Sequence, residues 1–187
     1  MHSFPTKYFC LKKQIFIAKN FKIMPIRYED HFLIMKWRNE QIKYLRQVET
    51  LTLNEQQKYF SKVIKKQFGE ISPNQILMSF FENERIIGYG GLVHIDWESK
   101  NAEISFLLDT NLNKQGLYEE KFTLFLELLI DLSKSIDLYK IYTYGYNLKK
   151  YRFKSLVKKG FKLEASLIDH KIINNNFYDV FIYSKKL

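Results

Sequence analysis

The stretch that decides the fold is Asn101–Glu120, NAEISFLLDTNLNKQGLYEE. Its first half predicts a buried strand, because polar residues alternate with the apolar residues Ala102, Ile104, Phe106 and Leu108. The second half is polar, passes Gly116 and enters an amphipathic helix. A helix that starts after a strand and a glycine-containing loop points backbone N–H groups and the positive end of its dipole at an anion. The stretch therefore predicts an anion site, although an ordinary strand-to-helix turn would use the same residues.

The composition predicts one globular domain with a large core. The chain has 187 residues, of which 46% are hydrophobic and 17% are aromatic, and this is enough to bury a core in a single domain. The net charge of +10 comes from 30 basic and 20 acidic residues, and it would suit an anionic partner. The charges are scattered and form no block of like sign. We therefore expect no nucleic-acid partner.

Metal sites, disulfides and membrane segments are not expected. Cys10 is the only cysteine, so no intramolecular disulfide can form. No apolar run is long enough to cross a bilayer, and Ile15–Ala18 is too short for the core of a signal peptide. We expect a cytoplasmic protein with no metal and no membrane partner. The histidines show no spacing typical of ligands: they are His2, His31, His94 and His170.

The chain is predicted to divide near residue 20. Residues 1–20 are expected to be an N-terminal extension, with an extra strand or a mobile arm as alternatives, and residues 21–187 a single domain. Thr52 and Glu55 form a capping box that opens a helix to about Phe68. Asp30 is a candidate N-cap of an earlier helix, which starts directly after it. The predicted strands are 21–26, 75–81, 85–97, 102–108, 138–144, 161–170 and 177–184, and two further helices are expected after Gly116 and over 149–159.

This order of elements, β-α-α-β-β-β-α-β-α-β-β, predicts an α/β fold with a mixed sheet. Strands 75–81, 85–97 and 102–108 are joined by tight turns and should form an antiparallel meander. Strand 138–144 follows a helical crossover, so it should lie parallel to the central strand. A splay between these two strands would admit an extended ligand arm. The side chains expected to point inward from the last two helices are Phe122, Phe125, Leu126, Leu129, Leu132, Phe153, Leu156 and Val157.

Two local sequences resemble the GNAT N-acetyltransferases. Ala102–Leu108 takes the place of the family strand A-E-I-G-Y-x-L, and Asn113–Tyr118 takes that of the loop Q/R-x-x-G-x-G/A, of which Gly116 is kept. Lys158–Phe161 matches the K-x-G-F ending of the last family helix, with Asn147 as the Asn before that helix. The resemblance covers about residues 21–187. It implies the GNAT fold, a mixed and mostly antiparallel sheet of about seven strands flanked by about four helices.

The resemblance implies direct transfer of an acetyl group from acetyl-CoA to a primary amine. In the family, the backbone of the central strand pairs with the pantetheine arm and the N–H groups of the helix start hold the pyrophosphate. This chain has Asn113 in place of the usual Gln or Arg, and Tyr118 in place of a small residue. The positions implied for CoA are Leu107, Leu108, Asn113, Gln115, Gly116, Leu117, Tyr118, Glu119 and Asn147.

Glu103 is the first candidate for the base that deprotonates the amine, acting through a water molecule. A carboxylate in a partly desolvated cleft gains proton affinity, and its alternative role is to pair with a Lys or Arg. His94 on the preceding strand is the rival base. The position of the Tyr that many GNAT enzymes use as an acid falls on Leu156, so Tyr151 on the same helix is the candidate acid for the thiolate. The alternatives to it are Tyr144 and Tyr146.

The triplet Trp37-Arg38-Asn39 resembles the branch of the family that acts on amino-sugar nucleotides. Arg38 could grip a phosphate with two hydrogen bonds, and Trp37 could stack on a sugar or base. In the alternative, Trp37 belongs to the core and Arg38 pairs with an acid. The positions implied for the acceptor are Trp37, Arg38, Asn39, Arg46, Gln47 and His94.

The acceptor is expected to be a small-molecule amine, preferably a nucleotide-linked amino sugar, and the protein a monomer or homodimer. One alternative acceptor is a peptide or protein N-terminus, as in the ribosomal-protein branch that the chain also resembles. Another alternative is a catalytically silent GNAT-fold protein that binds CoA. A nucleic-acid-binding domain would need clustered Lys and Arg with exposed aromatic residues on one face, which the sequence does not indicate.

Overall fold

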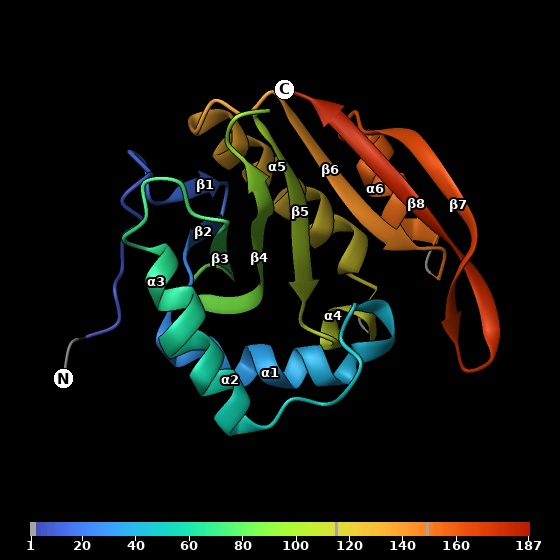
Figure 1. The fold of residues 1–187 in the computed structure, drawn as a ribbon, viewed down its shortest axis with the longest axis horizontal. Coiled ribbons are helices and arrows are strands. Elements are labelled where there is room, and N and C mark those ends of the chain that lie inside the picture. The colour runs from blue at the N-terminus through green and yellow to red at the C-terminus, as the bar shows by residue number, and fades with distance from the viewer. Residues whose placement is uncertain (1–2, 115, 149) are drawn as a thin grey trace.

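One eight-stranded sheet, in the order β1-β2-β3-β4-β5-β6-β8-β7, carries the fold (Figure 1). The computed structural model describes residues 3–114, 116–148 and 150–187. The strands are β1 (Phe16–Ala18), β2 (Phe21–Pro25), β3 (Gln75–Glu82), β4 (Arg85–Asp96), β5 (Asn101–Leu108), β6 (Lys140–Tyr146), β7 (Lys162–Ile173) and β8 (Asn176–Lys186). All neighbouring strands are antiparallel except β5 and β6, which are parallel. The predicted mixed, mostly antiparallel sheet is confirmed, with β1 in addition to the strands expected.

The helices follow the predicted order. They are α1 (His31–Glu40), α2 (Leu53–Tyr59), α3 (Lys65–Gln67), α4 (Asn111–Lys114), α5 (Tyr118–Ser135) and α6 (Lys150–Lys158). A π-helical turn over Phe60–Ile64 joins α2 to α3, so the single helix expected from Thr52 to Phe68 is continuous but irregular. The capping box of Thr52 and Glu55 is confirmed by bonds in both directions. In Figure 1 α5 passes behind β4 and β5, and α1 and α2 lie below the ends of these strands.

The core depends on the apolar stripe of α5. All five residues predicted for this stripe are fully buried, and the Phe125 ring stacks on Phe80 of β3 with 4.4 Å between ring centroids. On α6, Leu156 is buried as predicted, whereas the prediction for Val157 is wrong because its side chain is 57% exposed. Val157 lies beside the packed face of α6, which is set by Phe153 and Leu156 at a spacing of three residues. Gly160 ends this region with a φ of +82°, as expected for a helix stop.

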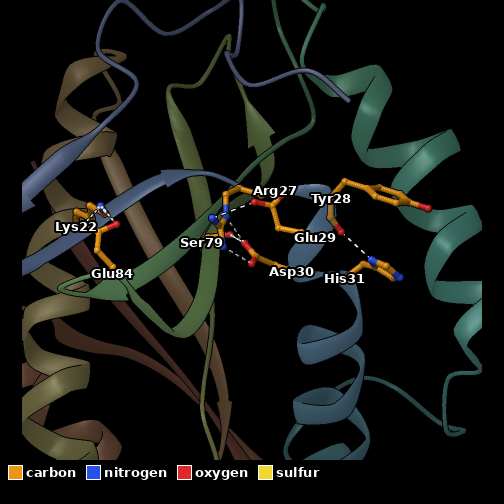
Figure 2. Close-up of polar contacts among 8 residues, drawn as sticks. All are labelled: Lys22, Arg27, Tyr28, Glu29, Asp30, His31, Ser79 and Glu84. Atoms are coloured by element: carbon orange, nitrogen blue, oxygen red, sulfur yellow. Dashed lines mark hydrogen bonds and ion pairs between the residues drawn. The ribbon is translucent and has the colours of Figure 1, made fainter. Parts of the chain in front are cut away.

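The Asp30 carboxylate does not cap α1, which corrects the sequence prediction. Asp30 belongs to a 3₁₀ turn, Tyr28–Asp30, and already has helical dihedral angles, so its side chain makes no capping hydrogen bond. It instead accepts bonds from Arg27 (Nη2–Oδ1 2.6 Å) and from Ser79 Oγ of β3 (2.7 Å) (Figure 2). These bonds tie the start of α1 to the sheet, which fixes the helix that later supplies Arg38.

The N-terminal residues contribute to the core over the part that is described. Tyr8 is 1% exposed, and its ring stacks on Phe68 with 4.1 Å between centroids. Its hydroxyl donates to the carbonyl oxygen of Leu77 (3.1 Å) and accepts from the Leu77 N–H (3.0 Å). Burial raises the pKa of this phenol far above its ordinary value. In the described residues no helix is long and apolar enough to cross a membrane.

The Tyr8→Phe variant should therefore be less stable. The substitution keeps the stacked ring but leaves the buried N–H of Leu77 without its acceptor, which costs about 1–3 kcal/mol of unfolding free energy. For a chain of this size, Tm falls by about 2–4 °C for each kcal/mol. Tyr28→Phe is the matched control, because Tyr28 is 37% exposed. Thermal unfolding of both variants measures the difference, and an unchanged Tm for Tyr8→Phe would contradict the role of this hydroxyl.

Candidate active site

The parallel strands β5 and β6 are paired over three residues only. The pairs are Asn101 with Lys140, Ala102 with Ile141 and Glu103 with Tyr142. Beyond Glu103, β5 continues to Leu108 and β6 to Tyr146 without further pairing, and the two strands diverge (Figure 1). The predicted splay is therefore present, and it begins at the strand position of Glu103.

A cavity of about 630 Å³ fills the splay and continues toward α1 and α2. This volume lies within the range typical of small-molecule sites, about 300–1,000 Å³. At the end between the strands, the cavity is lined by Ser105, Phe106, Tyr144, Gly145, Tyr146, Leu148, Phe153 and Leu156. At the other end its polar lining includes Arg38, Arg46, Gln47, Glu55, Gln56, Tyr59, Gln75, Tyr89, His94 and Glu103. One continuous cavity thus connects an apolar slot to a polar chamber.

Glu103 stands where the slot meets the chamber, and both of its carboxylate oxygens have partners. Oε2 accepts from His94 Nδ1 (2.9 Å), and Oε1 is ion-paired with the Arg46 guanidinium. The Glu103 side chain is 8% exposed, whereas the Arg46 side chain is 51% exposed. The ion pair that the sequence left open as an alternative is present.

Arg46 is fixed from two sides. Its guanidinium lies over the Tyr144 ring, 4.7 Å from the centroid, a cation–π arrangement. Burial alone would lower the pKa of Arg46, but the hydrogen bond and the charge of Glu103 raise it above its ordinary value. Arg46 follows α1 by a short loop, so its contact with Glu103 ties this loop to the central strand.

His94 occupies an irregular position in β4. The pairing of β4 with β5 shifts in register between Val93 and Asp96, and His94 has a φ of +50°. A bulge of this kind places an extra residue on one strand and re-aims its side chain. The His94 side chain is 62% exposed and lines the cavity. The sequence carries no signal for the bulge, because a register shift is a relation between two strands.

Arg38 is the residue of the predicted acceptor triplet that lines the cavity. Its Nη1 donates to the Tyr89 hydroxyl (2.9 Å) and its Nε to Gln47 Oε1 (3.0 Å). Within the described part of the chain no carboxylate is paired with it. Arg38 thus presents a half-buried guanidinium to the cavity with only neutral partners.

The other two residues of the triplet have structural contacts. Trp37 is 4% exposed and lies in the hydrophobic core, which is the alternative that the sequence left open for this residue. Asn39 exchanges two hydrogen bonds with the backbone of Leu51, at 2.9 and 2.8 Å. Its Oδ1 also accepts from Gln47 Nε2 (3.0 Å). Asn39 therefore holds the loop that carries Arg46 and Gln47.

The conformation of the loop before α5 requires Gly116, but it leaves fewer backbone N–H groups available for a phosphate than the sequence predicts. Gly116 has a φ of +69°, which only glycine adopts at little cost. The N–H groups of Gly116 and Leu117 donate to Asn113 O (3.3 Å) and Leu112 O (3.0 Å), so they are already used within the loop. The N–H groups of Glu119 and Glu120 belong to the first turn of α5, where intrahelical acceptors are absent.

Several residues that the resemblance implies for CoA binding already make contacts within the protein. The carbonyl of Leu108 accepts from Gln41 Nε2 (2.8 Å), and the N–H of Asn147 donates to Asp179 O (3.0 Å). The Glu119 carboxylate is paired with Lys158 of α6 (2.5 Å), and this bond lowers its pKa. Leu107 is buried on β5. Gln115 and the side chain of Tyr151 lie outside the described residues.

Chamber residues that the sequence did not indicate come from the middle strands and α2. Tyr59 and Gln75 exchange hydrogen bonds at 3.2 and 3.1 Å, and Tyr89 holds Arg38. Burial raises the pKa of Tyr59. Tyr89 lies between Gly88 and Gly90 in a strand whose sequence shows no unusual feature. No local motif marks Tyr59, Gln75 or Tyr89 as part of a site.

Comparison with known proteins agrees with this geometry. A family model described as an acetyltransferase (GNAT) domain matches residues 23–182. The spermidine N-acetyltransferase of Vibrio cholerae, solved with CoA and spermine, superposes with a TM-score of 0.78 at 16% identity, covering 90% of this chain and 96% of that chain. The ribosomal-protein-S5-alanine acetyltransferase of Vibrio fischeri gives 0.71 at 15% identity, covering 93% and 97%. No curated protein matches the chain in sequence.

At these identities the solved structures establish the fold, and the family model establishes the family. The model spans most of the chain, and the splayed β5 and β6 with a helix start beyond them fit a donor that has an extended arm and a phosphate group. The sequence-based expectation of an acetyl-CoA-dependent N-acetyltransferase is confirmed at the level of the family. The chain belongs to the GNAT acetyltransferases, whose acyl donor is acetyl-CoA.

Proposed function

We propose that this protein transfers the acetyl group of acetyl-CoA to the primary amine of a small anionic metabolite, with a nucleotide-linked amino sugar as the preferred acceptor. The observation that carries this proposal is Arg38, a guanidinium on the cavity wall that no described carboxylate neutralises. A buried or half-buried cation is costly without a counter-charge. The fork of an Arg side chain matches phosphate and carboxylate groups, so an anionic acceptor would supply the missing partner.

The carboxylates of the cavity support the same choice of acceptor. Glu55 and Glu103 are the acidic residues in its lining. Glu55 bonds the Thr52 N–H and hydroxyl at 2.8 and 2.7 Å in the capping box of α2, and Glu103 is bound by Arg46 and His94. A polycation would need carboxylates that are not already paired. The wall therefore suits an amine that also carries negative charge better than it suits a polyamine.

For the donor, we propose that the pantetheine arm lies in the slot between β5 and β6. After Glu103, β5 pairs with β4 but no longer with β6, so backbone groups on its β6-facing edge can point into this slot. The pyrophosphate would meet the N–H groups of Glu119 and Glu120 at the start of α5, with Lys158 beside them. The thioester would then reach the junction at Glu103. A cytoplasmic location and a monomeric or homodimeric state stay predictions.

Acetyl-CoA should stabilise the protein against heat. At a ligand concentration about 100 times Kd, binding adds about 2.7 kcal/mol to the unfolding free energy. For a chain of this size Tm should rise by about 5–10 °C. Differential scanning fluorimetry with acetyl-CoA measures the shift, and ATP serves as the control because it carries phosphates but no pantetheine arm. No shift at millimolar acetyl-CoA would overturn the donor site.

Arg38→Gln should weaken the acceptor selectively. Hydrogen bonds to a charged group are worth about 1.5–3 kcal/mol, so KM for a UDP-linked amino sugar should rise about 10–100-fold. KM for acetyl-CoA should stay nearly unchanged. The matched control is Lys36→Gln, which removes one positive charge from the same helix at a side chain that is 54% exposed. The measurement is a steady-state acetylation assay with two anionic acceptors that each carry a primary amine, a UDP-linked amino sugar and a free amino-sugar phosphate.

The same assay decides between acceptors. Spermidine and a peptide with a free N-terminal Ala are run beside the UDP-linked amino sugar on the wild-type chain. Preference for spermidine or for the peptide would contradict the anionic acceptor and leave the acetyltransferase intact. Binding of acetyl-CoA without turnover of any of these amines would favour the catalytically silent alternative.

A further inference from the structure

We infer that the base of this acetyltransferase is the Nε2 atom of His94, and that Glu103 positions it instead of accepting the proton itself. The inference deepens the proposed function and rests on it, because it names the group that prepares the amine for attack. It starts from a chain of contacts on the cavity wall, from Arg46 through Glu103 to His94.

Glu103 is poorly placed to act alone. Its oxygens already accept from His94 Nδ1 (2.9 Å) and from Arg46. A proton taken from the amine would neutralise the carboxylate and so remove the charge that pairs with Arg46. Losing the ion pair would leave the Arg46 guanidinium without its carboxylate, and breaking such a pair is costly when one partner is buried. The arrangement favours a Glu103 side chain that keeps both donors and orients the His94 ring.

His94 is left with one ring nitrogen for chemistry. A carboxylate accepts hydrogen bonds, so the bond at 2.9 Å requires the His94 proton on Nδ1. The neutral ring then carries a lone pair on Nε2, which can accept a proton from an amine. This is the relation of carboxylate, imidazole and reacting group by which a carboxylate fixes the tautomer of a catalytic histidine.

The backbone at His94 supports a role beyond packing. A φ of +50° is uncommon for a non-glycine residue, and strained backbone positions are found often at functional sites. The bulge between Val93 and Asp96 places the exposed imidazole against the buried Glu103 of the neighbouring strand.

The proposed step balances as follows. The acceptor arrives as R–NH₃⁺ and gives one proton to His94 Nε2. The resulting amine attacks the thioester carbonyl carbon, so a C–N bond forms and the C–S bond breaks, and the electron pair of the C–S bond leaves on the CoA sulfur. The new amide nitrogen loses its second proton. Of the two protons released, one neutralises the thiolate and the other passes to solvent, and His94 returns to its neutral form.

The test compares His94→Gln and His94→Ala with the wild-type chain, using acetyl-CoA and a UDP-linked amino sugar. Removing a general base costs about 10²–10⁴-fold in rate, so kcat should fall at least 100-fold while KM for acetyl-CoA stays within about threefold. Exogenous imidazole should restore part of the activity of His94→Ala and none of that of Glu103→Ala. His170→Gln is the matched control, because His170 is an exposed residue of β7.

Glu103→Gln tests the positioning role. Its amide has one oxygen, and Arg46 is a donor only, so the oxygen should turn to Arg46 and the NH₂ group to His94 Nδ1. The ring proton would then move to Nε2 and remove the base. We therefore expect Glu103→Gln to lose about as much kcat as His94→Gln. Long-range ¹H–¹⁵N NMR spectra of the imidazole nitrogens should show the Nδ1–H tautomer for His94 in the wild type and the Nε2–H tautomer in Glu103→Gln.

The outcomes separate the two levels of proposal. A wild-type chain that binds acetyl-CoA but acetylates no amine overturns the proposed function and the role of His94 with it. Normal wild-type turnover with kcat unchanged in His94→Gln overturns the base alone, and a simultaneous loss in Glu103→Gln would then make Glu103 the base. An Nε2–H tautomer in the wild type would also overturn the inference, whether or not an acceptor is known.

Discussion

The cavity depends on where one parallel ladder stops. β5 and β6 share three residue pairs, and the last of them joins Glu103 to Tyr142. Before this point the strands form ordinary sheet, and after it they separate and leave the slot that the donor arm would occupy. The register therefore does two things at once, because it opens the slot and places a carboxylate at its mouth. A longer ladder would close the slot, and a shorter one would open it below Glu103, which would then be paired with Val93 of β4 alone.

The loop after α1 couples the two ends of the site. Arg46 is ion-paired with Glu103 on the central strand, and Oε1 of the adjacent Gln47 accepts a hydrogen bond from Arg38 Nε (3.0 Å). Asn39 in turn bonds the backbone of Leu51 and so fixes the far end of this loop. Movement of the loop would disturb the Arg38 guanidinium and the Glu103 carboxylate together. Arg38 and Glu103 are thus connected through two neighbouring residues of one loop.

Local patterns predicted the elements of the fold, but not the contacts of the site. Three predicted features each depend on a few neighbouring residues, and all three are present: the apolar stripe of α5, the capping box of Thr52 and Glu55, and the turn at Gly116. The sequence predicts that the Asp30 carboxylate caps α1, and this prediction is wrong for two reasons. A 3₁₀ turn precedes α1, and the carboxylate accepts from Ser79 of β3 instead. For β1 the sequence leaves a strand and a mobile arm open, because its three residues are defined by pairing with β2. The contact of Arg46 with Glu103 spans 57 residues of sequence, and the bulge at His94 exists only between two strands.

The fold by itself does not choose the acceptor. The Vibrio cholerae structure holds spermine on the same architecture at 16% identity, so shared strand order is compatible with a polycation in that protein and with a different amine in this one. The choice of acceptor then depends on the side chains of the cavity wall. Here both lining carboxylates have partners within the protein, whereas Arg38 meets only a phenol and an amide. Under the proposed function, the electrostatics of these few side chains, placed by a short ladder and one loop, would select the acceptor that the architecture leaves open.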